Sequence, residues 1–174
     1  VNGVLAVGVT FVIVTGGIDL SLGTVMTFCS VMTAVFIAFW NLPVPIGILG
    51  GLITGAVCGV INGTLISKLK IPAFISTLGM MMVTKGLSLV ISGTRPIYLV
   101  HIPVFRQITM GTIFEIPYGV LIFFAAAIIA SIILNKTILG RYAFAIGSNE
   151  DAAHLSGINV DRWKIAVYGL NGIF

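Results

Sequence analysis

The longest polar stretch of the chain is KTILGRYAFAIGSNEDAAHLSGINVDRWK, residues 136–164. It holds four of the nine basic residues and three of the five acidic ones, whereas almost everything before it is apolar. A segment this polar must lie in water, because burying unpaired charges is costly. It therefore marks a place where the chain leaves an apolar environment.

The composition is that of a membrane protein. Hydrophobic residues make up 58% of the chain, charged residues only 8%, and the mean hydropathy is +1.17. Soluble domains carry about 25% charged residues, so this chain lacks the surface charge to dissolve. Long unbroken apolar runs predict an all-α, polytopic transmembrane helix bundle rather than a barrel. The net charge of +4 comes mostly from residues between these runs, so it does not indicate nucleic-acid binding.

The apolar runs predict five complete spans and a partial sixth. In chain order they cover residues 1–18, 20–40, 46–67, 71–91, 118–135 and 165–174. We expect a single transmembrane domain over residues 1–174. Because the chain starts without Met and stops inside an apolar run, we expect it to be an internal fragment.

Charge asymmetry predicts the orientation. If the spans alternate, two loop cations, Arg95 and Arg106, fall on one side of the membrane, and the other six fall on the opposite side: Lys68, Lys70, Lys136, Arg141, Arg162 and Lys164. The positive-inside rule then places residues 136–164 in the cytoplasm and the 92–117 loop outside.

The polar stretch contains signals for a short helix. Ser148 is a plausible N-cap with Asp151 three residues later, and Gly157 suits the position after the helix end. About two turns, over residues 149–156, are too short to be stable alone, so this helix must pack on something. Ala152, Ala153 and Leu155 would offer a compact apolar knob. These residues alone do not decide between an ordinary loop and a docking element.

One face of the third run consists of glycine. The glycines recur every four residues, at Gly47, Gly51, Gly55, Gly59 and Gly63. Such a stripe lets a neighbouring helix backbone approach closely. We therefore predict tight helix packing here rather than a substrate groove.

Asp19 is costly if it lies in lipid, by about 2.5–3.5 kcal/mol. The glycines before it allow an unwound backbone at that depth. It could be the ion or proton site of a secondary transporter. Alternatively, it caps the next helix together with Ser21, which the Asp-x-Ser pattern favours.

Other polar residues lie within the apolar runs. Lys85 could snorkel to the outer interface, pair across helices or line a path, and snorkelling is the favoured interpretation. Asn62, Thr77 and Thr84 are candidates for hydrogen bonds between helices.

Nothing in the sequence indicates a catalytic or metal centre. His101 and His154 are isolated, and both cysteines, Cys29 and Cys58, lie inside apolar runs. The dipeptide Gly-Lys of a nucleotide-binding loop never occurs, nor does Gly-x-Ser-x-Gly or His-Glu-x-x-His. We therefore expect no metal, no cofactor and no enzymatic activity.

Three stretches together resemble one family. They are VGVTFVIVTGGIDLSLG at 7–23, IPAFISTLGMMMVTKG at 71–86 and TILGRYAFAIGSNEDAAHLSGI at 137–158. Their order and spacing are similar to those of the permease subunits of bacterial ATP-binding-cassette importers for ribose and other simple sugars. The resemblance covers nearly the whole chain.

The resemblance implies a larger machine in the bacterial inner membrane. It implies a second permease, usually an identical copy, a cytoplasmic ATPase that supplies the energy, and a periplasmic sugar-binding protein. It also implies more helices than the six expected here. The rival hypotheses are an ion-coupled secondary transporter that uses Asp19, and a structural membrane subunit without a transport role.

The same resemblance assigns a role to the short helix. The residues that fall where the family's coupling helix docks into the ATPase are Asn149, Glu150, Asp151, Ala152, Ala153, His154, Leu155, Ser156 and Gly157. His154 and Asp151 depart from the usual residues without breaking the pattern. Asp19 falls in the family's Gly-Ile-Asp-Leu-Ser signature.

Overall fold

The computed structural model describes residues 1–99, 102–113 and 115–174, so His101 lies outside the described residues. Apart from two short strands, the regular elements are α-helices. In chain order these are α1 (Asn2–Val14), α2 (Leu22–Ala38), α3 (Val44–Ser67), α4 (Ala73–Ser92), α5 (Pro103–Met110), β1 (Thr112–Ile113), β2 (Ile116–Pro117), α6 (Tyr118–Lys136), α7 (Ile138–Ser148), α8 (Glu150–Leu155) and α9 (Val160–Ile173).

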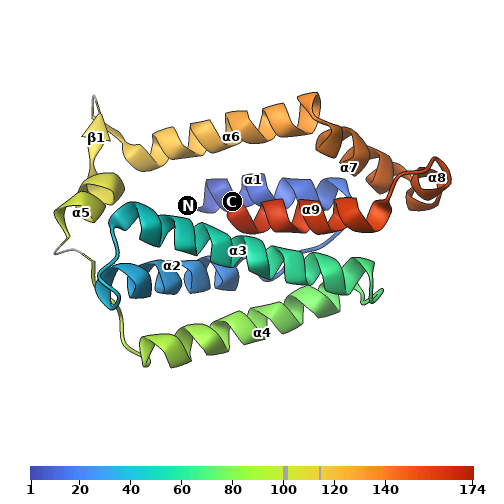
Figure 1. The fold of residues 1–174 in the computed structure, drawn as a ribbon. Helices are drawn as coiled ribbons and strands as arrows, with labels where there is room; N and C mark the ends of the chain where they lie inside the picture. Colours follow the sequence, from blue (N-terminus) through green and yellow to red (C-terminus); the bar gives the residue numbers. More distant parts are fainter. Residues whose placement is uncertain (100–101, 114) are drawn as a thin grey trace.

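The long helices lie side by side in a bundle (Figure 1). In this view α1, α9 and α3 form the middle, α6 lies along one flank, and α2 and α4 lie along the other. The antiparallel strands β1 and β2 form a minimal hairpin beside α5 at one end of the bundle. Helices α7 and α8 extend from the opposite end.

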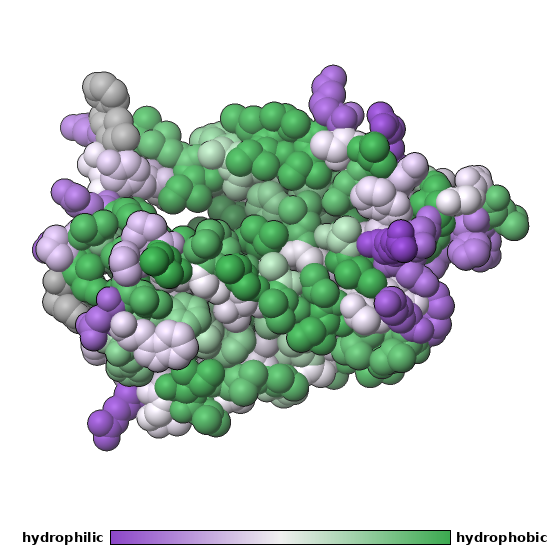
Figure 2. Space-filling model, in the orientation of Figure 1, coloured by the Kyte–Doolittle hydropathy of each residue, from purple (hydrophilic) through white to green (hydrophobic). Residues whose placement is uncertain are grey.

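The surface between the two ends is apolar. Figure 2 shows hydrophobic side chains across the middle of the bundle and most hydrophilic ones at its ends. Helix α6 exposes a continuous set of large apolar side chains, including Ile122, Phe124, Ile128 and Ile132. Because water would not stabilise such a belt, this surface faces the lipid of a membrane.

Three described helices, α3, α4 and α6, are long and apolar enough to cross a bilayer. The apolar helices α1 and α2 are shorter, with 13 and 17 residues. The expected five complete spans and partial sixth therefore remain a prediction. The runs expected at 1–18 and 20–40 are shorter as helices, because residues 15–21 form a non-helical connection between them.

Glycine ends α1. Gly16 has a φ of +75°, and its N–H donates to Ile13 O at 2.9 Å, while Gly17 N–H donates to Val12 O at 3.0 Å. This pair of hydrogen bonds is a Schellman motif, which a left-handed glycine allows at no steric cost. It turns the chain back toward the bundle immediately before Asp19.

The glycines of α3 lie against two neighbouring helices. All five are buried. A Cβ atom at Gly47 or Gly51 would meet the side chains of Ile37 and Thr33 on α2.

The other three glycines face α9. A Cβ atom at Gly55 would meet the carbonyl oxygen of Gly172, and one at Gly59 would meet the carbonyl oxygen of Tyr168. A Cβ atom at Gly63 would lie 2.7 Å from the Cα of Ile165. Since α9 numbers rise as α3 numbers fall, the two helices run antiparallel with their backbones in close contact.

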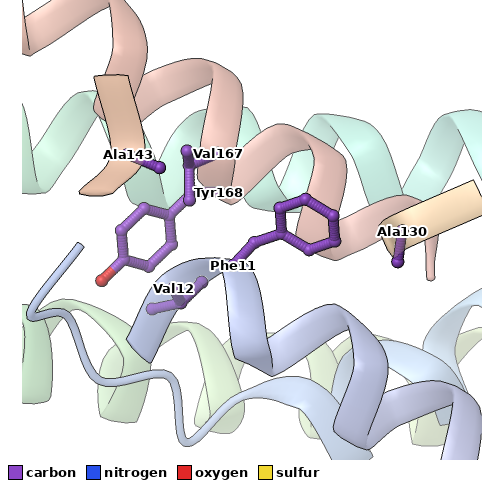
Figure 3. Packing of buried hydrophobic residues seen from close by; sticks show 6 residues of the cluster. All are labelled: Phe11, Val12, Ala130, Ala143, Val167 and Tyr168. Carbon is purple, nitrogen blue, oxygen red and sulfur yellow. The ribbon is translucent and has the colours of Figure 1, made fainter. Parts of the chain in front are cut away.

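A second core joins α1 and α9 to α6 and α7. Figure 3 shows Phe11 and Val12 of α1 beside Tyr168 of α9, with Ala143 of α7 and Ala130 of α6 completing the cluster. Phe11 and Val12 are fully buried. Helix α7, which lies in the polar stretch 136–164, is therefore packed against the transmembrane helices through Ala143.

The expected loop at 92–117 and the polar stretch at 136–164 are more helical than the sequence analysis predicts. Helix α5 and the hairpin occupy part of the first, and α7, α8 and the start of α9 occupy most of the second. The ammonium of Lys70, between α3 and α4, lies 3.2 Å from the carboxylate of Asp161 at the start of α9. This contact places two of the predicted cation-rich connections at the same end of the bundle.

The α3–α9 contact predicts that Gly59→Ala destabilises the protein by about 1–3 kcal/mol, because the new methyl group forces the two backbones apart. Thermal unfolding of the purified protein in detergent would measure this loss. Gly79→Ala is the matched control, because a Cβ atom there meets nothing within 4 Å. It should leave stability unchanged or raise it by up to about 1 kcal/mol, as expected for glycine replacement in a helix. Equal midpoints for the two variants would contradict the proposed role of the contact.

Candidate functional site

The short helix α8 covers Glu150–Leu155, and Asn149 caps it. The Asn149 side-chain oxygen accepts a hydrogen bond from Ala152 N at 2.9 Å. The expected cap, Ser148, is instead the last residue of α7, so that prediction was wrong by one residue. Asn149 has the extended backbone that a cap requires, with a φ of −160°.

The end of α8 matches the sequence prediction. Gly157 has a φ of +82°, and its N–H donates to His154 O at 3.0 Å. Ile158 N–H donates to Ala153 O at 3.1 Å, which completes a Schellman motif. Both ends of this six-residue helix are therefore fixed by local hydrogen bonds.

One side of α8 is held by the rest of the chain. Ala153 is buried with Ile146 of α7 and Val160 of α9, and Ile158 and Trp163 pack around them. The ring of Trp163 also meets Tyr142 of α7 edge to face, with the ring centroids 5.0 Å apart.

An ion pair adds to this brace. The Lys164 ammonium, on α9, donates to the Glu150 carboxylate at 2.7 Å. Helix α8 is thus attached to both α7 and α9, and its position follows theirs.

The other side of α8 is open. Every residue from 149 to 157 except Ala153 is exposed, and the side chain of Leu155 is 88% exposed. An apolar side chain held this far out on a fixed polar helix is suited to enter a pocket of another protein. Of the expected knob, Ala152 and Leu155 face outward, whereas Ala153 faces inward.

A separate set of polar residues forms a network between the helices. Both oxygens of the Asp19 carboxylate accept hydrogen bonds. One accepts from the Ser21 N–H at 2.8 Å and from the Ser21 hydroxyl at 2.6 Å. The other accepts from the side-chain amide of Asn171 on α9 at 2.7 Å.

The network continues into α3 and α4. The Asn62 amide donates to the Ser21 hydroxyl oxygen at 3.2 Å, and Asn62 Oδ1 accepts from the Ser76 hydroxyl at 3.2 Å. Asn62 and Ser21 are each 1% exposed. Polar side chains therefore connect α9, the start of α2, α3 and α4 inside the bundle.

This network has the chemistry of a structural clamp. Both oxygens of Asp19 already accept hydrogen bonds from Ser21 and Asn171, so the carboxyl group serves as an acceptor that ties the α1–α2 connection to α9. Within residues 1–99, 102–113 and 115–174, no group of three or more His, Cys, Asp or Glu side chains could hold a metal ion. Asp19 accepts from the backbone and hydroxyl of Ser21, the residue that precedes α2, but no side chain caps the free N–H groups of α2, so the expected side-chain cap was wrong.

The sequence-predicted residues thus fall into separate places. Helix α8 lies at one end, the Asp19–Ser21–Asn62 network lies inside, and the glycine stripe lies between α3 and its neighbours. Lys85 belongs to none of these groups, because it lies on an exposed part of α4.

Sequence reasoning missed Asn171 and Ser76. Asn171 is 2% exposed and its Oδ1 atom accepts no hydrogen bond from any residue that the structure describes. Asn171 lies inside an apolar run, as Asn62 does, so the sequence contained a signal that could have identified it. Ser76 lies next to Thr77 on the polar face of α4, but nothing local indicates its partner.

Comparison with known proteins identifies the family. The family described as "Branched-chain amino acid transport system / permease component" matches residues 1–174. The ribose import permease protein RbsC of Bacillus subtilis is 42% identical over 174 residues, which cover 99% of this chain and 54% of that protein. No solved structure matches.

Two further relatives carry other sugar names. The fructose import permease protein FrcC of Rhizobium meliloti is 36% identical over 178 residues, covering 98% of this chain and 49% of that protein. The L-arabinose transport system permease protein AraH of Escherichia coli is 37% identical over 176 residues, covering 99% of this chain and 52% of that protein. The chain therefore spans about half the length of the curated relatives it matches.

The resemblance to sugar-importer permeases that three sequence motifs indicate is confirmed by these identities over nearly the full chain. Together with the match over residues 1–174, they show that this multi-pass membrane chain belongs to the family of branched-chain amino acid transport system permease components.

Proposed function

We propose that this chain is part of the permease subunit of an ATP-driven importer that moves a simple sugar across the bacterial inner membrane. The names of the relatives support a ribose-like, fructose-like or arabinose-like solute. The permease would have no catalytic activity. A cytoplasmic ATPase would supply energy, a periplasmic binding protein would deliver the sugar, and a second copy of the permease would complete the path.

Helix α8 is the observation that carries this proposal. It is held rigidly to α7 and α9 on one side and exposes Leu155 on the other. The cation-rich connections lie at the same end of the bundle, which supports a cytoplasmic location for residues 136–164. A transporter that takes its energy from a separate protein needs such a force-bearing contact.

The alternative is an ion-coupled secondary transporter that uses Asp19. The two hydrogen-bonded oxygens of Asp19 weigh against it, because Ser21 and Asn171 already occupy the carboxylate that a cation would have to bind. An ion-coupled carrier also has no use for a braced, exposed docking helix. We therefore favour a structural role for Asp19 at the start of α2.

The docking role predicts that Leu155→Ser weakens ATPase binding about ten-fold or more. An interfacial leucine contributes about 1.5–3 kcal/mol when it is fully buried, and each 1.4 kcal/mol is a factor of ten in affinity. Titration of the purified ATPase against the complete permease in nanodiscs would measure the affinity. Leu69→Ser is the control, because Leu69 is 64% exposed beyond the end of α3 and lies outside α8. The Leu69→Ser permease should bind the ATPase with the same affinity as the unmodified permease.

Replacement of residues 150–157 by a flexible linker should have a larger effect. Membrane insertion should remain intact because no apolar helix changes, whereas ATP hydrolysis should no longer drive uptake. Proteoliposomes with all subunits would report both quantities. Uptake at the original rate would rule out α8 as the coupling element.

Asp19→Asn distinguishes the two transport classes. The new amide keeps an oxygen for Ser21, and the Asn171 amide can rotate to offer its unpaired oxygen. We expect ATP-driven uptake to stay within about three-fold of the original rate, since a neutral hydrogen bond contributes about 1 kcal/mol. An ion-coupled carrier would instead show uptake without the ATPase, and this variant would abolish its dependence on the ion gradient.

A further inference from the structure

Lys85 is a charged residue in the interior of a membrane-spanning helix. It is exposed, and it forms no ion pair or hydrogen bond with any described residue. A lysine in lipid costs about 2.5–3.5 kcal/mol, and such residues almost always face the bundle interior or a water-filled cavity. The side of α4 that carries Lys85 therefore needs a specific explanation.

Snorkelling toward the membrane surface is geometrically unfavourable here. The nearer end of α4 is its C-terminal end at Ser92, seven residues or about 10 Å away. Side chains on a helix lean toward its N-terminus, so Lys85 starts out directed away from that end. Its ammonium is better placed to stay at its own depth.

Three hydroxyl side chains from two helices lie near this position, in a pocket that is otherwise largely apolar. Lys85 lines a cavity of about 320 Å³ between α2 and α4 together with Thr24, Thr27 and Ser88. Met81, Met82 and Leu89 complete the α4 side. The volume lies at the lower end of the range of about 300–1,000 Å³ that is usual for small-molecule sites.

The hydroxyl protons in this cavity are already used. Thr24 donates to Ser21 O at 2.8 Å, Thr27 to Gly23 O at 2.9 Å, and Ser88 to Thr84 O at 2.7 Å. The Thr24 oxygen already accepts one hydrogen bond, from the Thr84 hydroxyl at 3.0 Å, and keeps one further lone pair. The oxygens of Thr27 and Ser88 also remain as acceptors, while the Lys85 ammonium offers up to three donors.

This combination matches a neutral solute rich in hydroxyl groups. Each sugar hydroxyl both donates and accepts a hydrogen bond, so it can use the ammonium and the hydroxyl oxygens together. None of the described residues that line the cavity is acidic, so a cationic solute would meet only repulsion from Lys85.

We propose that the α2–α4 cavity is a water-filled subsite on the sugar path, and that Lys85 holds the sugar there by donating hydrogen bonds to its hydroxyl groups. This inference rests on the proposed function, which supplies the sugar. It goes further by naming where the sugar binds and which side chain recognises it.

Cysteine accessibility tests whether the cavity holds water. The reconstituted importer would carry Lys85→Cys in a Cys29→Ala, Cys58→Ala background that retains uptake. A charged, membrane-impermeant methanethiosulfonate added to both sides should label Cys at this position at least about ten-fold faster than at the controls, because only a hydrated thiol ionises and reacts.

The controls are Val83→Cys and Leu87→Cys, which lie two residues before and after Lys85. They match its depth but line the apolar groove between α3 and α4. The proposal would be overturned by equal labelling rates at the three positions. It would also be overturned if Lys85→Cys were not labelled.

Uptake tests sugar recognition. Lys85→Met keeps the length of the side chain but removes its donors, and it should lower the maximal rate of ribose uptake at least about ten-fold, as expected for the loss of charged hydrogen bonds. Lys85→Arg should retain uptake within about three-fold. The half-saturating ribose concentration and the ATPase activity stimulated by the binding protein should not change, because neither depends on this cavity.

Normal uptake by Lys85→Met would overturn the inference and leave the proposed function intact. A lack of ATP-dependent uptake of ribose, fructose and arabinose by the unmodified importer would overturn the proposed function instead. The labelling experiment would in that case still decide whether the cavity is hydrated.

Discussion

The close packing of α3 on α9 is the contact on which the other features depend. Three glycines of α3 and Gly172 of α9 let the two backbones approach closely. Because lipid provides no hydrophobic force between helices, such contacts must come from dispersion at short range. The same register sets Asn171 at a distance of 2.7 Å from Asp19.

The non-helical connection between α1 and α2 also depends on contacts with α9. In a membrane, non-helical backbone is tolerated only where the protein satisfies its polar groups. Gly16 and Gly17 close α1 with a Schellman motif, and the Tyr168 hydroxyl donates to Ile18 O at 3.3 Å. Asp19 then accepts from Ser21 at the start of α2. The signature Gly-Ile-Asp-Leu-Ser thus forms a non-helical connection, and two side chains of α9, Tyr168 and Asn171, donate hydrogen bonds to it.

Local patterns predicted the local features of this fold and missed the distant ones. The glycine period of four, the apolar runs of α3, α4 and α6, and the role of Gly157 all depend on neighbours within a few residues. The cap of α8 was misplaced by one residue because Ser148 and Asn149 have similar capping chemistry. The Asp19–Asn171 contact joins positions 152 residues apart, so no local pattern contains it. Helix α7 was not predicted, although Thr137 caps it and its apolar residues Ala143 and Ile146 recur on one face.

Helix α9 connects the two candidate functional regions. Its first turns carry Val160 and Lys164, which hold α8, and eleven residues after Val160, about 16 Å along the axis, it carries Asn171. Between these points its backbone is locked to the glycines of α3. The proposed docking of an ATPase on α8 would therefore act on the polar network at Asp19 through one continuous helix that also contacts α3. A buried alanine and an ion pair attach α8 to this helix, which suits such a role better than a flexible loop would.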